Sequence, residues 1–340
     1  MGAADPGGWI GRGMQAHCMF LHTAVNLCTV APHARHLLRD DDLSPAEQAE
    51  VLALAARLKA QPFTHKPLQG PVTVATIYDR PTLRTQLSFA AGVAELGGHE
   101  FSIDAGLAAA GTRESIPDVA RVIGRQAGLL VWRTAEQAHL EEMAQHAGIP
   151  VVNALTDLFH PCQLLADLQT VTEHKGTPAG LTVTFLGDGG CNMGHSWILA
   201  GTTAGMHIRI SSPAGHAPLP EIVQRAQEIA AATGGSVTLI DDPVDAVGGA
   251  DVVVTDTWVS MGREDEESDR LATFRPWSLT PELLGHAAAD AIVLHCLPAH
   301  RGLEISPEVI DGPASVVWDE AENRRHAQKA LLAWLWERRA

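Results

Sequence analysis

The chain has 340 residues, more than one ordinary hydrophobic core accommodates, so two domains of roughly 150 residues each are expected. With 46% apolar and 19% charged residues, the composition is that of a globular protein rather than a disordered one. The formal net charge of −16 argues against a nucleic-acid partner, because a phosphate backbone is bound by clustered Lys and Arg. An anionic small substrate would need a few local cations to hold it.

The cysteines and the apolar runs indicate in which compartment the protein is expected. The number of cysteines is odd and their spacing is not that of metal ligands, which favours a reducing cytoplasm over a disulfide scaffold. These cysteines are Cys18, Cys28, Cys162, Cys191 and Cys296. No apolar run approaches the length of a membrane span, so no membrane partner is expected.

The first 34 residues differ from the rest of the chain. His22 and Asn26 interrupt the apolar stretch between residues 19 and 30, so a signal peptide fits poorly. A loose tail, or a start assigned upstream of the real one, fits better. We expect residues 1–34 to be an extra, disordered tail.

Ordered structure is expected from about Arg35. Ser44 is a predicted helix N-cap, with Pro45 in the first turn and Glu47 three residues after the cap. Apolar strand patterns then alternate with helical ones, which predicts a parallel sheet covered on both faces. The expected strands are 73–78, 99–103, 128–132 and 150–153, and the expected helices are 83–96, 115–126, 136–146 and 160–173.

A polar segment with Gly and Pro at 173–180 marks the start of a second unit. Its expected strands are 181–187, 207–211, 236–240, 251–255 and 291–295, and its first helix begins near Met193. A last helix, 320–337, is expected to return to the first half. The predicted class is therefore α/β, with two domains that each hold a parallel sheet with helices on both faces. The domains are 35–175, together with helix 320–337, and 176–319.

The first candidate site follows strand 73–78. A helix that begins at the carboxyl end of a strand directs its unpaired N–H groups outward, where a phosphate can bind. Arg84 lies in the first turn of the predicted helix between the hydroxyls of Thr82 and Thr85. An ordinary capped helix with a solvated Arg explains this stretch equally well.

Other reactive or polar residues also follow strand ends, where α/β sheets bind ligands. They are Arg133, His160 and Gln163 in the first half, and Asp256, Ser260 and Cys296 in the second. Each alone has an ordinary explanation, since a single Cys is more often a small buried residue than a reactive one. Together they predict an anion pocket that faces an amino-acid pocket.

The stretch GDGGCNMG, residues 187–194, follows a strand as a dinucleotide-binding loop does. Its glycine spacing does not match the dinucleotide fingerprint, and no acidic residue ends the next strand. A nicotinamide cofactor is therefore not expected.

Segments spread along the chain resemble the ornithine carbamoyltransferases. These segments are VWRT, FHPCQLLADLQT, TDTWVSMG, LHCLPAHRG and DEAENRRHAQKALL. The similarity extends from Arg35 to the C-terminus, and HCLPAHRG with the Ser-Met-Gly loop distinguishes this branch from the aspartate carbamoyltransferases. The resemblance implies a homotrimer with a carbamoyl-phosphate domain, an ornithine domain and a closing cleft. It implies citrulline formation, as in cytoplasmic arginine biosynthesis, without a metal or an organic cofactor.

The resemblance also implies roles for single residues. Carbamoyl phosphate would be bound by Thr82, Leu83, Arg84, Thr85, Arg133, His160 and Gln163. The amine substrate would contact Cys191, Asp256, Ser260, Met261, Cys296 and Leu297. The catalytic residues would be Arg84, His160, Cys296 and Arg324.

The phosphate loop departs from the family pattern. Leu83 replaces a Thr, and the loss of its hydrogen bond to a charged oxygen would cost on the order of 1.5–3 kcal/mol. Thr82 replaces a Ser conservatively. Gln86 and Ala90 replace an Arg and Glu pair worth a few tenths of a kcal/mol. Ala109 falls where the family has a Gln that reaches a neighbouring subunit's carbamoyl phosphate.

Because of Cys191, the sequence does not decide which amine is the substrate. It replaces an Asn that contacts the amino acid in the family, and a thiol lacks the paired donor and acceptor of an amide. The chain could be an ornithine carbamoyltransferase of reduced affinity, a carbamoyltransferase for a different diamino acid or biosynthetic intermediate, or a non-catalytic paralogue. The intact Arg84, Arg133, His160 and Cys296 argue against the last.

Overall fold

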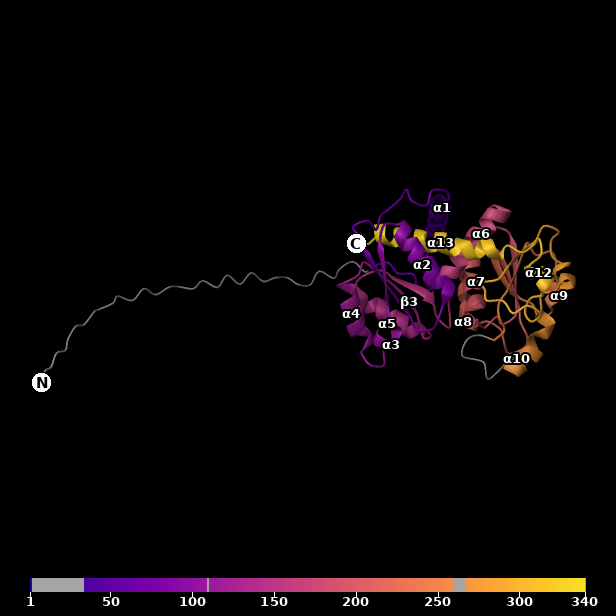
Figure 1. Ribbon diagram of the computed structural model, residues 1–340. Helices are drawn as coiled ribbons and strands as arrows, with labels where there is room; N and C mark the ends of the chain where they lie inside the picture. The colour runs from indigo at the N-terminus through magenta and orange to yellow at the C-terminus, as the bar shows by residue number, and fades with distance from the viewer. Residues whose placement is uncertain (2–33, 109, 260–266, 340) are drawn as a thin grey trace. The chain divides into compact units, whose positions relative to one another are not determined.

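The computed structural model describes Met1 and residues 34–108, 110–259 and 267–339 (Figure 1). Of the expected tail 1–34, residues 2–33 lie outside the described residues. No helix in the described ranges is long and apolar enough to cross a membrane.

The first sheet has the strand order β2-β1-β3-β4, and every paired strand in it is parallel. Its strands are β1 (Thr73–Tyr78), β2 (His99–Ile103), β3 (Leu129–Arg133) and β4 (Val151–Leu155). The helices that precede and follow them are η1 (Asp40–Asp42), α1 (Pro45–Ala60), α2 (Leu83–Glu95), α3 (Ala105–Ala108), α4 (Ile116–Gly124), α5 (Gln137–Ala147) and α6 (Pro161–Lys175).

Strands β1, β3 and β4 are buried on both faces, which explains why they are apolar at successive positions, whereas the edge strand β2 is more exposed. On one face Val74 and Leu129 pack in a core shared with α1, α2 and α6. On the other face Ala75 and Leu130 pack against α4 and α5. Adjacent strand residues point to opposite faces, so each face needs its own apolar set.

The start of α1 confirms the predicted cap. The Ser44 N–H donates to Glu47 Oε2 at 2.9 Å, and the Glu47 N–H donates to Ser44 Oγ at 3.3 Å. These reciprocal bonds satisfy two backbone donors that have no partner inside the helix. The local sequence therefore sets where the ordered chain begins its first long helix.

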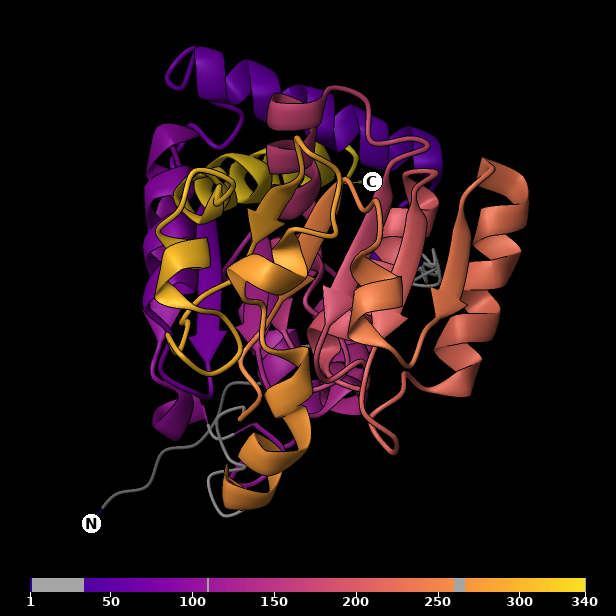
Figure 2. The ribbon, with the colours of Figure 1, turned by 90° about the vertical axis from the view of Figure 1, so that its right-hand side faces the viewer.

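The second sheet has the order β7-β6-β5-β8-β9 and is also parallel throughout its described pairs. Its strands are β5 (Thr182–Leu186), β6 (His207–Ser211), β7 (Ser236–Leu239), β8 (Val252–Thr255) and β9 (Ile292–Leu294). Its helices are α7 (Asn192–Thr203), α8 (Pro220–Thr233), α9 (Pro243–Val247), α10 (Glu267–Phe274), η3 (Arg275–Trp277), α11 (Pro281–Leu284) and α12 (Pro307–Ile310). In Figure 2 its strands point toward the side on which α10 lies.

The last helix, α13 (Val317–Glu337), returns to the first half as predicted and begins three residues earlier than expected. It packs against α6, α2 and α1, as the yellow helix of Figure 1 shows. Ala327, Leu331 and Trp334 bury their side chains in the core of the first sheet. The α/β class with a returning helix is therefore confirmed, and the predicted division at 175 and 176 falls directly after α6.

Two fully buried carboxyl groups lie where α13 meets α6. Asp167 and Glu320 form a hydrogen-bonded pair, and the Gln163 Nε2 group donates to both, at 2.8 Å and 3.0 Å. The His295 N–H, just past β9, donates to Glu320 at 2.8 Å. Burial raises the pKa of both acids, that of Asp167 to about 7, so the pair retains a proton near neutral pH.

This pair should make stability depend on pH in a defined direction. A carboxyl with a raised pKa binds its proton more tightly in the folded chain, so the free energy of unfolding falls as pH rises from about 4 to 7. Asp167→Asn removes this titration. The difference in the free energy of unfolding between the variant and the wild type, measured by urea denaturation, should therefore shift by roughly 2–4 kcal/mol in favour of the variant from pH 5 to pH 8.

Asp241→Asn provides the control, because Asp241 is exposed. It should leave the difference between the two pH values unchanged. An equal difference for Asp167→Asn and the wild type would contradict the assignment.

Candidate active site

A cavity of about 950 Å³ opens at the carboxyl ends of both sheets. Of the predicted and described site residues, all except Gln163 line it. The first half contributes Thr82, Leu83, Arg84, Thr85, Arg133, His160 and, from α13, Arg324. The second half contributes Cys191, Asp256, Cys296 and Leu297. Ser260, Met261 and Ala109 lie outside the described residues.

Positive charge is concentrated in the first half of the cavity. Arg133 ends β3, is 8% exposed, and its Nε has no hydrogen-bond partner among the described residues. Burial, together with the neighbouring charges of Arg324, Arg80 and Arg84, lowers the pKa of Arg133 to about 10. A group of repelling cations with an unused donor is suited to an anion.

His160 lies beside these arginines as the residue preceding α6. Burial lowers its pKa well below the usual value, and the charges of Arg324, Arg133 and Arg84 act in the same direction. The imidazole is therefore neutral near pH 7. A neutral imidazole has one N–H, which can donate to a substrate oxygen without adding another charge.

Gln163 does not line the cavity but contacts Arg324, which does. Its Oε1 accepts a hydrogen bond from Arg324 at 2.5 Å, and Arg324 also donates to Thr85 Oγ1 at 3.3 Å. Because Gln163 Nε2 is held by Asp167 and Glu320, the amide oxygen is directed at the guanidinium. Gln163 is thus placed to orient Arg324.

Arg84 connects the two halves. It donates a hydrogen bond to the carbonyl oxygen of Leu297 across the cavity. Leu297 has a φ of 57°, the left-handed region that side chains rarely adopt, and it is the one non-glycine residue there in the described chain. Residues held in this region are concentrated at functional sites.

The backbone of Leu297 is held by a buried histidine. Its N–H donates to His295 Nδ1 at 2.9 Å, and His295 Nε2 lies 3.3 Å from Glu304 Oε1. Since Nδ1 accepts a hydrogen bond, Nε2 carries the imidazole hydrogen and donates a hydrogen bond to Glu304. The fully buried His295 and Glu304 therefore fix a backbone that faces the cavity.

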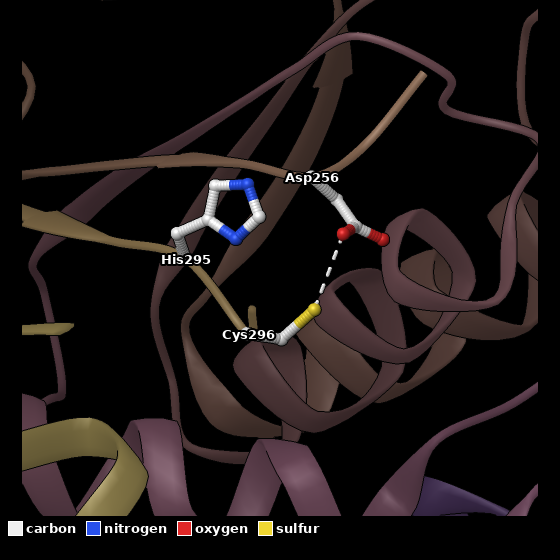
Figure 3. Close-up of side chains that lie close together, drawn as sticks. All are labelled: Asp256, His295 and Cys296. Atoms are coloured by element: carbon white, nitrogen blue, oxygen red, sulfur yellow. Dashed lines mark hydrogen bonds between the residues drawn. The ribbon is translucent and has the colours of Figure 1, made fainter. Parts of the chain in front are cut away.

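Cys296 and Asp256 line the second half of the cavity, and Figure 3 shows their side chains directed toward each other. Cys296 Sγ donates to Asp256 Oδ1 at 3.2 Å, and the Thr257 N–H donates to the same oxygen at 2.7 Å. Burial raises the pKa of Cys296 well above its usual value, so the side chain remains a thiol. Burial also raises the pKa of Asp256.

These two residues and His295 bring possible metal-ligand atoms within 4.8 Å of one another. Both nitrogens of His295 are already used, by the Leu297 N–H and by Glu304. A metal ion would have to displace one of these bonds. The described geometry fits an orienting network better than an open ligand set.

Cys191 is the N-cap of α7, and its Sγ accepts a hydrogen bond from the Gly194 N–H at 3.5 Å. Burial raises the pKa of this thiol well above its usual value. The side chain thus retains a capping role while it lines the cavity. A thiol is a weak acceptor, so it adds little polar recognition there.

Some cavity residues were missed from the sequence. Asp188 follows β5 and accepts a hydrogen bond from Arg270 of α10, which also donates to the Trp258 carbonyl at 2.5 Å. His216 Nδ1 lies 3.7 Å from Asp188. Asp188 could have been found, because it follows a strand end like the other candidates. Arg270 and His216 carried no such signal, since neither lies beside a strand.

Comparisons with known proteins identify the family to which the chain belongs. Residues 35–173 match the family described as aspartate/ornithine carbamoyltransferase, carbamoyl-P binding domain. Residues 179–335 match the family described as aspartate/ornithine carbamoyltransferase, Asp/Orn binding domain. The two matches meet near the end of α6, between the two sheets.

Similar proteins cover nearly the same residues. The ornithine carbamoyltransferase of Clavibacter michiganensis subsp. michiganensis is 62% identical over 301 residues, 88% of this chain and 98% of the relative. That of Mycolicibacterium paratuberculosis is 57% identical over 306 residues, 90% of this chain and 99% of the relative.

Solved structures of ornithine carbamoyltransferases are similar to this chain in fold and in sequence. The ornithine carbamoyltransferase of Pyrococcus furiosus has a TM-score of 0.85 and 41% identity, over 89% of this chain and 97% of that one. The enzyme of Gloeobacter violaceus has a TM-score of 0.80 and 43% identity, over 88% of this chain and 98% of that one. The chain therefore belongs to the aspartate/ornithine carbamoyltransferase family.

Proposed function

We propose that the protein transfers the carbamoyl group of carbamoyl phosphate to the side-chain amine of L-ornithine, giving L-citrulline and phosphate. The observation that carries the proposal is the concentration of Arg84, Arg133 and Arg324 around one cavity, opposite Asp256 and Cys296. The relatives named ornithine carbamoyltransferase, at 56–62% identity over most of the chain, support the choice of substrates.

The cations would act on the leaving group. Arg84 and Arg133 bind the phosphate, and their charge stabilises the dianion as its bond to the carbamoyl carbon breaks. Thr82 and Thr85 add hydroxyl groups at the start of α2, and Leu83 offers its backbone N–H. Neutral His160 donates to the carbamoyl oxygen, where negative charge develops.

The amine must react in its uncharged form. Free ornithine carries a protonated side-chain amine near neutral pH, and the arginines together with desolvation favour its neutral form in the cavity. The Asp256 and Cys296 pair faces the same space and orients the nitrogen. The nitrogen then forms the C–N bond, the C–O bond to phosphate breaks, and the proton lost by the nitrogen passes to the departing phosphate.

One observation favours an amine other than ornithine as the substrate. Cys191 lines the cavity where an amide would contact an amino acid in the family, and its thiol is engaged at the start of α7. A carbamoyltransferase that uses another diamino acid or a biosynthetic intermediate is therefore the alternative.

The proposal also covers the roles of the two domains, the oligomeric state and the compartment of the enzyme. Residues 35–175 with helix 320–337 would bind carbamoyl phosphate, and residues 176–319 would bind the amine. The protein would act as a homotrimer in the cytoplasm, in arginine biosynthesis. Exposed apolar side chains on α2 and on the edge strand β2, Leu87 and Phe101, are consistent with a surface that subunits cover.

The first test is turnover with a panel of amines. Purified protein with carbamoyl phosphate should form citrulline from ornithine at a higher kcat/KM than it carbamoylates diaminobutyrate, diaminopropionate, putrescine or lysine. Preference for another amine would replace the main proposal by the alternative, and no turnover with any amine would favour a non-catalytic role.

Arg84→Gln shows whether turnover comes from this cavity. Loss of one charged donor should lower kcat/KM by about 10²–10³-fold. Arg121→Gln is the matched control, because Arg121 is paired with Asp118 on the exposed face of α4. It should leave turnover unchanged.

Leu83→Thr should strengthen carbamoyl-phosphate binding. Leu83 is 75% exposed at the first turn of α2 and lines the cavity, so a hydroxyl can be added there without opening the core. One hydrogen bond to a charged oxygen should lower the KM for carbamoyl phosphate roughly tenfold, as measured by initial rates. Val122→Thr, at an exposed position of α4, should leave this KM unchanged. An unchanged KM for both variants would refute the missing contact.

Sedimentation equilibrium tests the proposed trimer. The species in solution should have three times the mass of the chain, because the apolar side chains on α2 and β2 are expected to pair between subunits. A single-chain mass at micromolar concentration would overturn this part of the proposal.

A further inference from the structure

The segment that leads to His160, residues 156–160, belongs to the first half but is held by a helix of the second half. This segment, called the His160 loop here, runs from the end of β4 to the start of α6. Helix α7 approaches it with Asn192, His195 and Ser196, which lie three and four residues apart and so share one face.

Two of these residues bind carbonyl groups of the loop. Asn192 Nδ2 donates to the Thr156 carbonyl at 2.9 Å. His195 Nδ1 lies 3.2 Å from the Leu158 carbonyl, and its Nε2 accepts from the Leu219 N–H at 3.2 Å. This pattern fixes the tautomer, with the hydrogen on Nδ1. The loop is therefore bound at two points before it reaches His160.

Ser196 makes the third contact, directly with the backbone of His160. The His160 N–H donates to Ser196 Oγ at 2.8 Å, and the Ser196 hydroxyl donates to Asp40 Oδ2 at 2.5 Å. Asp40 and Ser196 are buried, at 4% and 0% exposure. Because the hydroxyl hydrogen points to Asp40, a lone pair of Ser196 is directed at the His160 N–H.

The imidazole depends on this backbone support. His160 Nδ1 is buried and has no hydrogen-bond partner in the described part of the chain. The ring therefore takes its position from its own backbone and from packing. A change in the His160 backbone would move the ring relative to the arginines.

Asp40 is not needed simply to join the two halves. The adjacent Asp41 already does so, with Arg225 of α8 at 2.8 Å. Asp40 Oδ1, by contrast, is buried without a partner in the described residues, an arrangement that costs stability. Asp40 is a costly buried acid, and its hydrogen bond with Ser196 leads to His160, which suggests a role in the site.

We propose that Asp40 and Ser196 are positioning residues that hold the His160 backbone, and with it the imidazole, at the carbamoyl group. The inference rests on the proposed carbamoyl transfer. It adds that an acid in the first half and a hydroxyl in the second half jointly set the geometry of the reacting centre.

The state of Asp40 defines a conservative variant. Burial raises the pKa of Asp40 well above its usual range, so the site disfavours a charged side chain. Asn has the same shape and retains an oxygen that accepts from Ser196. Leu has a similar size and offers no acceptor.

Ser196→Ala and Asp40→Leu should each lower kcat about 10–100-fold, since small displacements of a reacting group have effects of this order. The KM for ornithine should change less than about threefold, because the amine contacts are untouched. Asp40→Asn should retain most of the wild-type kcat. Values are taken per binding site, with sites counted by calorimetric titration with a stable phosphonate analogue of carbamoyl phosphate.

Two matched controls separate positioning from general stability. Thr203→Ala removes another buried hydroxyl from α7, one that bonds only within its helix, to the Leu199 carbonyl at 2.8 Å. Asp41→Ala removes the neighbouring link between the halves. Both should retain the wild-type kcat per site.

The outcomes are distinguishable. Wild-type kcat per site in Ser196→Ala, or equal losses in the controls, would overturn the inference and leave the proposed function intact. An Asp40→Asn variant as slow as Asp40→Leu would also overturn it, and this comparison still decides if Ser196→Ala does not fold. A wild-type protein that forms no carbamoylated amine would contradict both proposals.

Discussion

The mutual repulsion of Arg84, Arg133 and Arg324 in one partly buried cavity is the constraint on which the site depends. The three side chains come from α2, β3 and α13, so separate elements must share the cost of holding like charges together. The fold supplies acceptors behind them, such as the Gln163 amide and the Leu297 carbonyl. These acceptors are neutral, so they orient the guanidinium groups without cancelling their charge. The positive potential remains available for an anionic ligand.

The same constraint explains why the halves are so closely connected. Arg84 of the first half reaches the Leu297 carbonyl of the second, while α7 of the second half holds the His160 loop of the first. The α13 helix adds a third link, because Glu320 accepts from the His295 backbone beside Cys296. Each half therefore completes the other's part of the cavity. A substitution on one side should change the geometry on the other even without contacting substrate.

Local patterns allowed most of the fold to be predicted from the sequence. The limits of β1, β2 and β6 agree with the expected strands, because turn residues bound each of them, and of the three only β1 is an almost continuous buried apolar run. The cavity residues at strand ends were found for the same reason. The Asp40 and Ser196 contact joins residues 156 positions apart, and no periodic pattern reports such a pair. The position of Gln163 behind Arg324 likewise depends on how α6 and α13 pack, which a single sequence does not encode locally.

The departures from the family pattern fall on the substrate side of the framework. Cys191 still caps α7, so the helix that holds the His160 loop begins in the same place, while the side chain that faces the cavity has lost an amide. Leu83 begins α2 and still has a backbone N–H, but it lacks the hydroxyl of the Thr that the family has at this position. In both cases the backbone role persists and only a polar side-chain contact is missing. Under the proposed function, such changes would weaken or redirect substrate recognition without disturbing the arginine cluster, so the choice of amine would be the property most open to change in this chain.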